Sequence, residues 1–293
     1  MSTQTSFALV TGASQGLGKA FATELAQRGH NVLLTALPGT GLFQLCDSLE
    51  NRYNITAHAL ACDLTFESEV QRLLQWIREN YAVHLLINNA GIGGTAAFSH
   101  TPFDFIDNVI QLNVRATVML THQLLPLLQR HRQAWVLNVA SMAAFSPMGY
   151  KTVYPASKAF VRHFSRGLQE ELKASGVWVS VVHPGPMATN PDCSRRIARQ
   201  GWLGKAALLP PETLARKALD QLFKKKARII IGGMNRFNRL LMWLVPTSIR
   251  LPLLGRIVQR ELAGSTFKPP GRPARNASQP VPAPPVGHCL PAE

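Results

Sequence analysis

Residues 152–160, TVYPASKAF, place a tyrosine and a lysine four positions apart, at Tyr154 and Lys158. On a helix this spacing puts both side chains on one face, where the ammonium group can act on the phenol. A free tyrosine has a pKa near ~10, and a neighbouring cation lowers that pKa and makes the phenol a usable general acid. The pair therefore indicates acid–base chemistry, although tyrosine and lysine also occur at this spacing without a catalytic role.

A glycine-rich loop, TGASQGLG, begins at Thr11, where the first apolar segment of the chain ends. Gly12, Gly16 and Gly18 would let the backbone turn tightly and approach a pyrophosphate at the start of the following helix. The spacing GxxxGxG differs from the commoner GxGxxG, and glycines needed only for a tight turn are the competing explanation. The position between a strand and a helix favours a dinucleotide site.

Short β-rich segments alternate with helical patterns along the chain. The expected strands cover residues 6–11, 31–36, 55–62, 85–88, 134–140, 177–183 and 227–231, and the expected helices include 16–29, 40–53, 103–131 and 153–175. Strands that are apolar on both faces and separated by helices predict a parallel sheet covered on both sides.

Several short motifs occur in an order that resembles the short-chain dehydrogenase/reductase family. They are TGASQGLG, CDL at 62–64, NNAG at 88–91, LNV at 112–114, Ser141, YPASK at 154–158 and HPGPMAT at 183–189. The resemblance covers roughly residues 6–232. It implies an α/β fold, a Rossmann-type doubly wound parallel sheet of about seven strands, with a nicotinamide dinucleotide as hydride carrier.

The resemblance also implies four catalytic roles. Tyr154 matches the general acid, and Ser141 matches the residue that positions the substrate oxygen. Lys158 matches the lysine that holds the ribose hydroxyls and lowers the tyrosine pKa, and Asn113 the asparagine that supports a water-linked proton relay. Ser141 and Tyr154 could both donate hydrogen bonds to a carbonyl oxygen on which negative charge develops.

Cofactor contacts are implied for a larger set. Asp63 is placed to bind the adenine edge and Thr189 the carboxamide, whereas Asn89 could face the cofactor or simply hold a strand end. The full set is Gly12, Ser14, Gln15, Gly16, Leu17, Gly18, Asp63, Leu64, Asn89, Ala90, Gly91, Tyr154, Lys158, Pro184, Gly185 and Thr189.

The end of the second expected strand bears on the choice between NAD and NADP. An NAD site usually has an acid there, but this segment reads TALPGTG at 35–41, with Leu37 near the place of the arginine common in NADP-preferring relatives. Without an acid, nothing repels a 2′-phosphate, which Thr35, Thr40 or backbone amides of the turn could bind. The sequence therefore favours NADP(H) over NAD(H).

Composition excludes several classes of protein. The chain has 293 residues, 46% of them hydrophobic and 16% charged, which is typical of a globular protein. Its four cysteines (Cys46, Cys62, Cys193, Cys289) form no CxxC pair or metal-ligand cluster, so we expect neither disulfides nor a metal, and a reducing compartment. We find no signal-peptide pattern at the start and no apolar run of about 18 residues, and so expect a cytoplasmic protein.

Charge is concentrated at one end. The formal net charge is +15, of which residues 1–194 carry +1 and residues 195–293 carry +14. No zinc-finger, RNP or helix-turn-helix pattern accompanies the basic part, so we expect no nucleic-acid partner. Residues 1–232 are predicted to form the dehydrogenase domain, 233–264 an amphipathic extension, and 265–293 a proline-rich tail that does not pack.

The extension has two possible roles. It mixes apolar residues with arginines, and Pro246 and Pro252 are expected to divide it into short helical pieces. It could pack over the substrate cleft, or it could rest on an anionic membrane as a peripheral anchor. Upstream, residues 189–210 combine apolar and basic side chains. These suit a hydrophobic substrate with an anionic end, such as an acyl thioester or a lipid, but could equally serve packing.

Taken together, the sequence predicts a carbonyl reductase or alcohol dehydrogenase, with a hydrophobic 3-oxoacyl or keto-lipid substrate and a homo-oligomeric assembly. The alternative is a dinucleotide-binding protein of low turnover whose basic last third binds a membrane or a protein partner.

Overall fold

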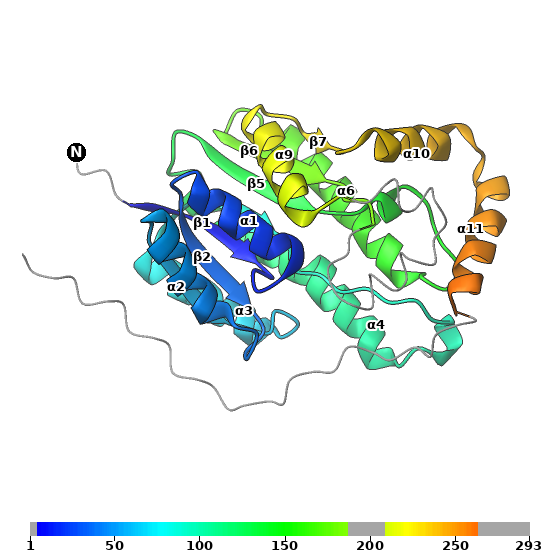
Figure 1. The fold of residues 1–293 in the computed structure, drawn as a ribbon, viewed down its shortest axis with the longest axis horizontal. Helices are drawn as coiled ribbons and strands as arrows, with labels where there is room; N and C mark the ends of the chain where they lie inside the picture. Colours follow the sequence, from blue (N-terminus) through cyan, green and yellow to red (C-terminus); the bar gives the residue numbers. More distant parts are fainter. Residues whose placement is uncertain (1–4, 187–208, 263–293) are drawn as a thin grey trace, which may run out of the picture.

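The computed structural model describes residues 5–186 and 209–262. In them one parallel sheet has the strand order β3-β2-β1-β4-β5-β6-β7 (Figure 1). The strands are β1 (Ser6–Thr11), β2 (Asn31–Ala36), β3 (Ala57–Ala61), β4 (Ala82–Asn88), β5 (Ala134–Val139), β6 (Val177–Val182) and β7 (Arg228–Ile229). The predicted seven-stranded, doubly wound sheet is confirmed.

Both faces of the sheet are buried, which explains the continuously apolar strands. In β1, Ala8 and Val10 join one hydrophobic core, while Phe7 and Leu9 join the other. The first core contains residues of α1 (Gly16–Gln27), α2 (Leu42–Tyr53) and α9 (Pro211–Phe223). The second contains residues of α3 (Glu67–Asn80) and α5 (Thr117–Leu128). Successive side chains of a strand point to opposite faces, so each strand serves two helical layers.

The long helix expected over 103–131 is present but not uniform. It consists of α4 (Phe103–Ile110), the π-helical segment η2 (Gln111–Ala116) and α5, with nearly constant helical backbone angles at the junctions. Such π segments inside helices frequently occur at functional sites. This one contains Asn113, a residue of the predicted catalytic set.

The carboxyl ends of the central strands meet at one edge of the sheet. β1 and β4 are paired in parallel, as are β4 and β5, so the residues that follow Thr11, Asn88 and Val139 emerge near one another. Helix α6 (Val153–Glu171) packs against β5 and β6 and begins at this same edge. Ligands of open α/β sheets bind at such an edge, where the strand order reverses.

Beyond β7 the chain forms α10 (Gly233–Leu244) and α11 (Thr247–Leu262), which lie at one end of the molecule, past α6 (Figure 1). The expected break at Pro246 is observed, but the one at Pro252 is wrong, because α11 continues through it. A proline removes one helical hydrogen bond, but the hydrogen bonds of the neighbouring turns maintain the helix. Arg250 donates a hydrogen bond to the carbonyl oxygen of Met242 and so ties α11 to the end of α10.

The sheet ends before this pair of helices, so we propose residues 1–232 as the domain and 233–264 as its extension. The proline-rich tail expected at 265–293 and most of the stretch 189–210 lie outside the described residues. Within residues 5–186 and 209–262, no helix is both long enough and apolar enough to cross a membrane.

Candidate active site

Tyr154 and Lys158 lie on successive turns at the start of α6, as their spacing predicted. The Lys158 side chain is buried, and its Nζ donates a hydrogen bond of 2.9 Å to the carbonyl oxygen of Val139 at the end of β5. Nζ is 6.0 Å from the centre of the Tyr154 ring. Burial lowers the pKa of Lys158 to about 8. The structure thus brings the predicted pair together, with the Lys158 ammonium group held near the Tyr154 ring by the end of β5.

Glycines of the loop after β4 allow this arrangement. A Cβ atom at Gly93 would lie 2.5 Å from Cδ2 of Tyr154, and one at Gly91 would lie 3.0 Å from Nζ of Lys158. The contact at Gly93 is shorter than real Cβ contacts, so this position needs glycine. The contact at Gly91 is tight, and a side chain there would require Nζ of Lys158 to shift by a few tenths of an ångström. Gly91 was in the predicted set through its motif. Gly93 was missed, because nothing local in the sequence shows that an aromatic ring lies over it.

Asn113 anchors the same loop. Its Oδ1 accepts a 2.9 Å hydrogen bond from the backbone N of Ile92, and its Nδ2 donates to the carbonyl oxygen of Ile92 and to Oγ of Ser157, each at 2.9 Å. Asn113 is buried in the π-helical segment. Its side chain therefore fixes the loop against Tyr154 and Lys158, whereas its role in a proton relay stays a prediction. Ser157 was missed by the sequence analysis, although it belongs to the YPASK motif.

Ser141 follows β5 and begins the short 3-10 helix η3 (Met142–Phe145). Its Oγ accepts a 3.1 Å hydrogen bond from the backbone N of Ala143, so the hydroxyl proton remains available for a substrate oxygen. The carbonyl oxygen of Ser141 is 3.1 Å from Nδ1 of His183, and the N of Met142 donates to the carbonyl oxygen of Pro184 at 2.8 Å. These contacts join the ends of β5 and β6 and set the position of the hydroxyl.

The glycine-rich loop has no side chains at the positions where its backbone turns and packs most closely. Gly12 and Gly16 have φ angles of +66° and +53°, in the left-handed region that favours glycine. A Cβ at Gly18 would lie only 2.0 Å from the carbonyl oxygen of Gly12 and 2.6 Å from Nδ2 of Asn89. The loop, which includes Ser14 and Gln15, leads directly into the N-terminus of α1 with Leu17 in its first turn. This geometry fits the pyrophosphate of a dinucleotide.

Asn89 holds strand ends together, one of its two predicted roles. Its Nδ2 donates to the carbonyl oxygens of Thr11 at 2.8 Å and Gly12 at 3.2 Å. The backbone N atoms of Asn89 and Ala90 each donate to Oγ1 of Thr11 at 3.0 Å. The loops after β1 and β4 therefore form one rigid unit at the site.

Other predicted cofactor residues also lie at this edge. Asp63 follows β3, and its Oδ1 accepts hydrogen bonds from N and Oγ1 of Thr65 at 3.0 and 2.7 Å, with the buried Leu64 between them. Thr35, proposed above as a phosphate ligand, is completely buried and cannot reach one. Thr40 is exposed, but its hydroxyl donates its one proton to the carbonyl oxygen of Leu37 at 2.6 Å. It would have to give up this hydrogen bond to donate to a phosphate at the turn after β2.

The C-terminal extension supports the site from outside the sheet. A Cβ at Gly185 would lie 2.5 Å from Oδ1 of Asn235 in the first turn of α10, so the two residues are in close contact. Asn235 is buried, and its Nδ2 donates to the carbonyl oxygen of Ile231 at 2.9 Å. Thr189, predicted to bind the carboxamide, lies outside the described residues.

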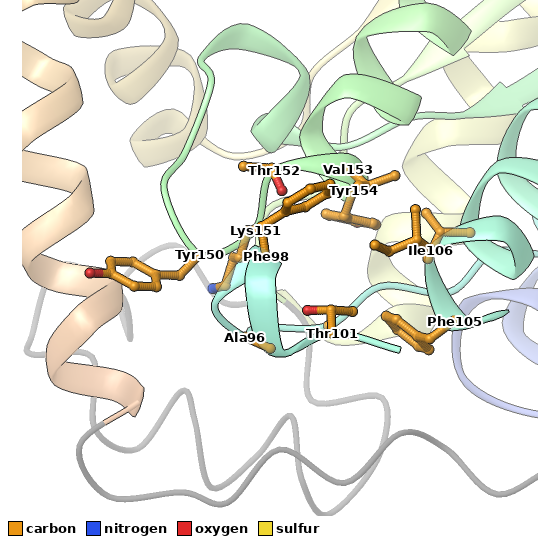
Figure 2. A pocket seen from close by; sticks show the side chains of 12 residues that line it. Ala96, Phe98, Thr101, Phe105, Ile106, Tyr150, Lys151, Thr152, Val153 and Tyr154 are labelled. Atoms are coloured by element: carbon orange, nitrogen blue, oxygen red, sulfur yellow. The ribbon is translucent and has the colours of Figure 1, made fainter. Parts of the chain in front are cut away.

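A mostly apolar pocket adjoins Tyr154 (Figure 2). Val153 and Tyr154 lie toward Ile106 of α4 in this view, while Tyr150 points away toward α11. The remaining lining residues are Gly94, Ala96, Phe98, Thr101, Phe105, Val109, Lys151 and Thr152. A hydrophobic group held here would have its reactive end beside the tyrosine.

Comparison with known proteins finds similar sequences and similar structures. A family model described as short chain dehydrogenase matches residues 6–199. The chain is 33% identical over 187 residues to a very-long-chain 3-oxoacyl-CoA reductase-A from Danio rerio, covering 62% of this chain. It spans only 58% of that relative's length.

Two solved structures are similar over most of their length. A short-chain dehydrogenase from Sphingobium yanoikuyae in complex with NADPH has a TM-score of 0.68 and 28% identity, covering 83% of this chain and 97% of that one. A bulky-bulky ketone specific alcohol dehydrogenase from Comamonas testosteroni has a TM-score of 0.67 and 28% identity, covering 83% and 95%.

Proposed function

The chain belongs to the short-chain dehydrogenase family, and from this premise we propose that it is an oxidoreductase that interconverts a carbonyl and an alcohol with a nicotinamide dinucleotide. The observation that carries the proposal is the buried Lys158, held by the end of β5 next to the Tyr154 ring. A buried cation beside a phenol favours the phenolate and so tunes Tyr154 for proton transfer.

Each side chain has a distinct task in the proposed reaction. When bound, the dinucleotide supplies or accepts the hydride. Ser141 and Tyr154 donate hydrogen bonds to the substrate oxygen and stabilise the charge that develops on it during carbonyl reduction. Tyr154 then transfers its proton to that oxygen, and Lys158 stabilises the resulting phenolate. Asn113 keeps the loop after β4 in place, so that Tyr154 and Lys158 retain their geometry.

We propose NADP(H) as the preferred cofactor. The turn after β2 has no acidic side chain, and Leu37 to Gly41 are all exposed, so the 2′-phosphate would meet no repulsion there. One similar structure is that of a complex with NADPH. Titration of the purified protein with both reduced cofactors, followed by fluorescence, should give a modestly lower Kd for NADPH. A lower Kd for NADH would contradict this preference and leave the reaction class untouched.

We propose a hydrophobic 3-oxoacyl or similar keto substrate. The pocket beside Tyr154 is largely apolar, and a relative is named as a very-long-chain 3-oxoacyl-CoA reductase. NADPH oxidation should be measured with 3-oxoacyl thioesters of increasing length, with keto-lipids and with small ketones. Each buried CH₂ group is worth about 0.8 kcal/mol, so kcat/KM should rise by up to about fourfold per CH₂ until the pocket is filled. Cofactor binding without turnover of any substrate would favour the alternative function, a low-turnover binding protein.

We propose that the C-terminal extension binds an anionic membrane surface through α10 and α11. Many large exposed apolar side chains gather on these two helices: Phe237, Leu240, Leu241, Trp243, Leu244, Ile249, Leu251, Leu253 and Ile257. Arginines accompany them at Arg236, Arg239, Arg250 and Arg256. Exposed apolar and basic side chains on short helices are typical of segments that lie in the interface of an anionic bilayer.

Vesicle co-sedimentation tests the membrane proposal. Binding should be stronger to anionic than to neutral vesicles and should weaken with salt, since each nearby basic side chain contributes about 1 kcal/mol. Because Asn235 contacts the site, point variants are safer than removing 234–293. The double variant Trp243→Glu with Leu244→Glu should lose binding, whereas Phe103→Glu, at an equally exposed phenylalanine of α4, should retain it. Equal sedimentation with both vesicle types would exclude the electrostatic component.

A further inference from the structure

Arginines from three separate elements gather at the outer edge of the sheet, near η3. Arg162 and Arg166 lie on α6, Arg228 lies on β7, and Arg239 lies on α10. A hollow of about 270 Å³ opens among them, lined by Arg162, His163, Arg166, Val181, His183 and Arg228. In Figure 1, α10 continues from β7 toward α11, on the side of the molecule away from α2. This hollow is separate from the glycine-rich loop and from the pocket beside Tyr154.

No acid of the described part of the chain, residues 5–186 and 209–262, forms an ion pair with any of the four arginines of this cluster. Arg162 instead lies over the ring of Phe145 at 4.6 Å, and Arg239 lies over the same ring at 5.8 Å. Partial desolvation of the guanidinium groups, followed by repulsion from the neighbouring arginines, lowers the pKa of both Arg162 and Arg228. Cations held together against their repulsion make a site that an anion would stabilise.

A buried histidine supplies independent evidence for a ligand. His183 is only 1% exposed and lines the hollow, and its Nδ1 faces the carbonyl oxygen of Ser141. Its Nε2 is buried and has no hydrogen-bond partner in the part of the chain that the structure describes. The carbonyl oxygen of Ser141 can only accept, so Nδ1 carries the proton, and burial lowers the pKa of His183 to about 4 and keeps the ring neutral. Nε2 is therefore an acceptor that needs a donor, which a protonated phosphate oxygen or a bridging water would supply.

We propose that this hollow is a second ligand site, which binds the phosphate group of a phosphate monoester. Guanidinium groups match phosphate oxygens in paired hydrogen bonds, and several of them converging from different elements can contact more than one oxygen. The volume is ample for a phosphate but small for a whole dinucleotide. The phosphate could be free, or it could belong to the nucleotide part of a thioester substrate. The second source rests on the function proposed above, whereas the site itself does not.

The residues of the proposed phosphate site contact the segment that follows β5 at the candidate active site. His183 contacts the backbone of Ser141, and Phe145, against which Arg162 and Arg239 lie, is the last residue of η3. A phosphate bound by the arginine cluster would therefore stabilise the position of η3 through these contacts. Its binding should raise the melting temperature of the protein, because a ligand that binds only the folded state stabilises it.

Calorimetric titration with inorganic phosphate tests the proposal, with NADP⁺ in excess to block the glycine-rich loop and chloride balancing the ionic strength. We expect saturable binding that the double variant Arg166→Gln with Arg228→Gln weakens by about tenfold or more. Both arginines are exposed, so the variant should fold. The matched control, Arg130→Gln with Arg132→Gln, changes two exposed arginines far from the hollow and should bind phosphate as the unchanged protein does.

Adenosine 3′,5′-bisphosphate separates the two sources. Tighter binding than inorganic phosphate, lost in the same double variant, would indicate a nucleotide-borne phosphate, and equal affinity would indicate free phosphate. The proposal is overturned if phosphate shows no saturable binding, if the cluster variant binds it unchanged, or if the control loses affinity equally. None of these readouts requires turnover, so their failure is distinguishable from failure of the proposed oxidoreductase function.

Discussion

Replacement of Tyr154 by phenylalanine is expected to lower kcat/KM for carbonyl reduction by about 10²–10⁴-fold, the usual contribution of a positioned general acid. The phenyl ring would still fill the space over Gly93, so the fold should change little, and the cofactor should still bind through its other predicted contacts. The measurement is steady-state oxidation of NADPH with the best substrate from the thioester and ketone screen, together with a fluorescence titration of the cofactor.

Tyr150 provides a matched control for this variant. It is another tyrosine that lines the pocket, but it points toward α11 and away from Tyr154 (Figure 2). Tyr150→Phe should therefore keep most of the activity. Full activity in Tyr154→Phe would show that the acid is another group, and equal losses in both variants would indicate an effect on the pocket instead of on proton transfer.

The second large effect is expected at Gly18. In Gly18→Ala the new Cβ would lie 2.0 Å from the carbonyl oxygen of Gly12, which belongs to the backbone and cannot turn aside as a side chain can. The loop must shift, and overpacking of this kind typically costs about 1–3 kcal/mol. If that cost falls on the cofactor-binding conformation of the loop, the cofactor Kd rises about 5- to 150-fold. Gly16→Val should also weaken both NADPH and NADH, because Gly16 has a φ angle of +53°.

Gly167→Ala is the control for the glycine loop. Gly167 lies in α6, and a Cβ there would meet no atom within 4 Å among the described residues. Its cofactor affinity should match that of the unchanged protein. Near-UV circular dichroism should show that all three variants are folded. An unaltered Kd in folded Gly18→Ala would remove this loop from the dinucleotide site.

The C-terminal extension contacts the turn after β6 at the candidate site and also exposes apolar side chains at the molecular surface. Asn235 packs against Gly185, and Arg250 ties α11 to α10, so the orientation of both helices is linked to the turn after β6. The two roles considered for the extension are therefore compatible. One end of α10 contacts the site, while Trp243 and Leu244 at its other end are exposed.

The sequence by itself determined the fold class and the order of strands and helices along the chain, and it predicted most of the residues placed at the candidate site. Continuous apolar strands separated by helices require a parallel sheet with two covered faces, which residues such as Phe7 and Ala8 realise on opposite sides of β1. The spacing of Tyr154 and Lys158 placed them on one helical face without any tertiary information, because helical geometry is local.

Only the tertiary structure decided which distant residues surround that pair. Gly93 lies against Tyr154, and Asn235 lies against Gly185. Asn113 accepts a hydrogen bond from Ile92. The residues of each pair are far apart in the chain. The same holds for the arginines around His183, which come from α6, β7 and α10. Such contacts depend on how the sheet brings separate elements together, and no local pattern records them. Pro252 shows the converse, since a residue that usually ends helices lies inside α11.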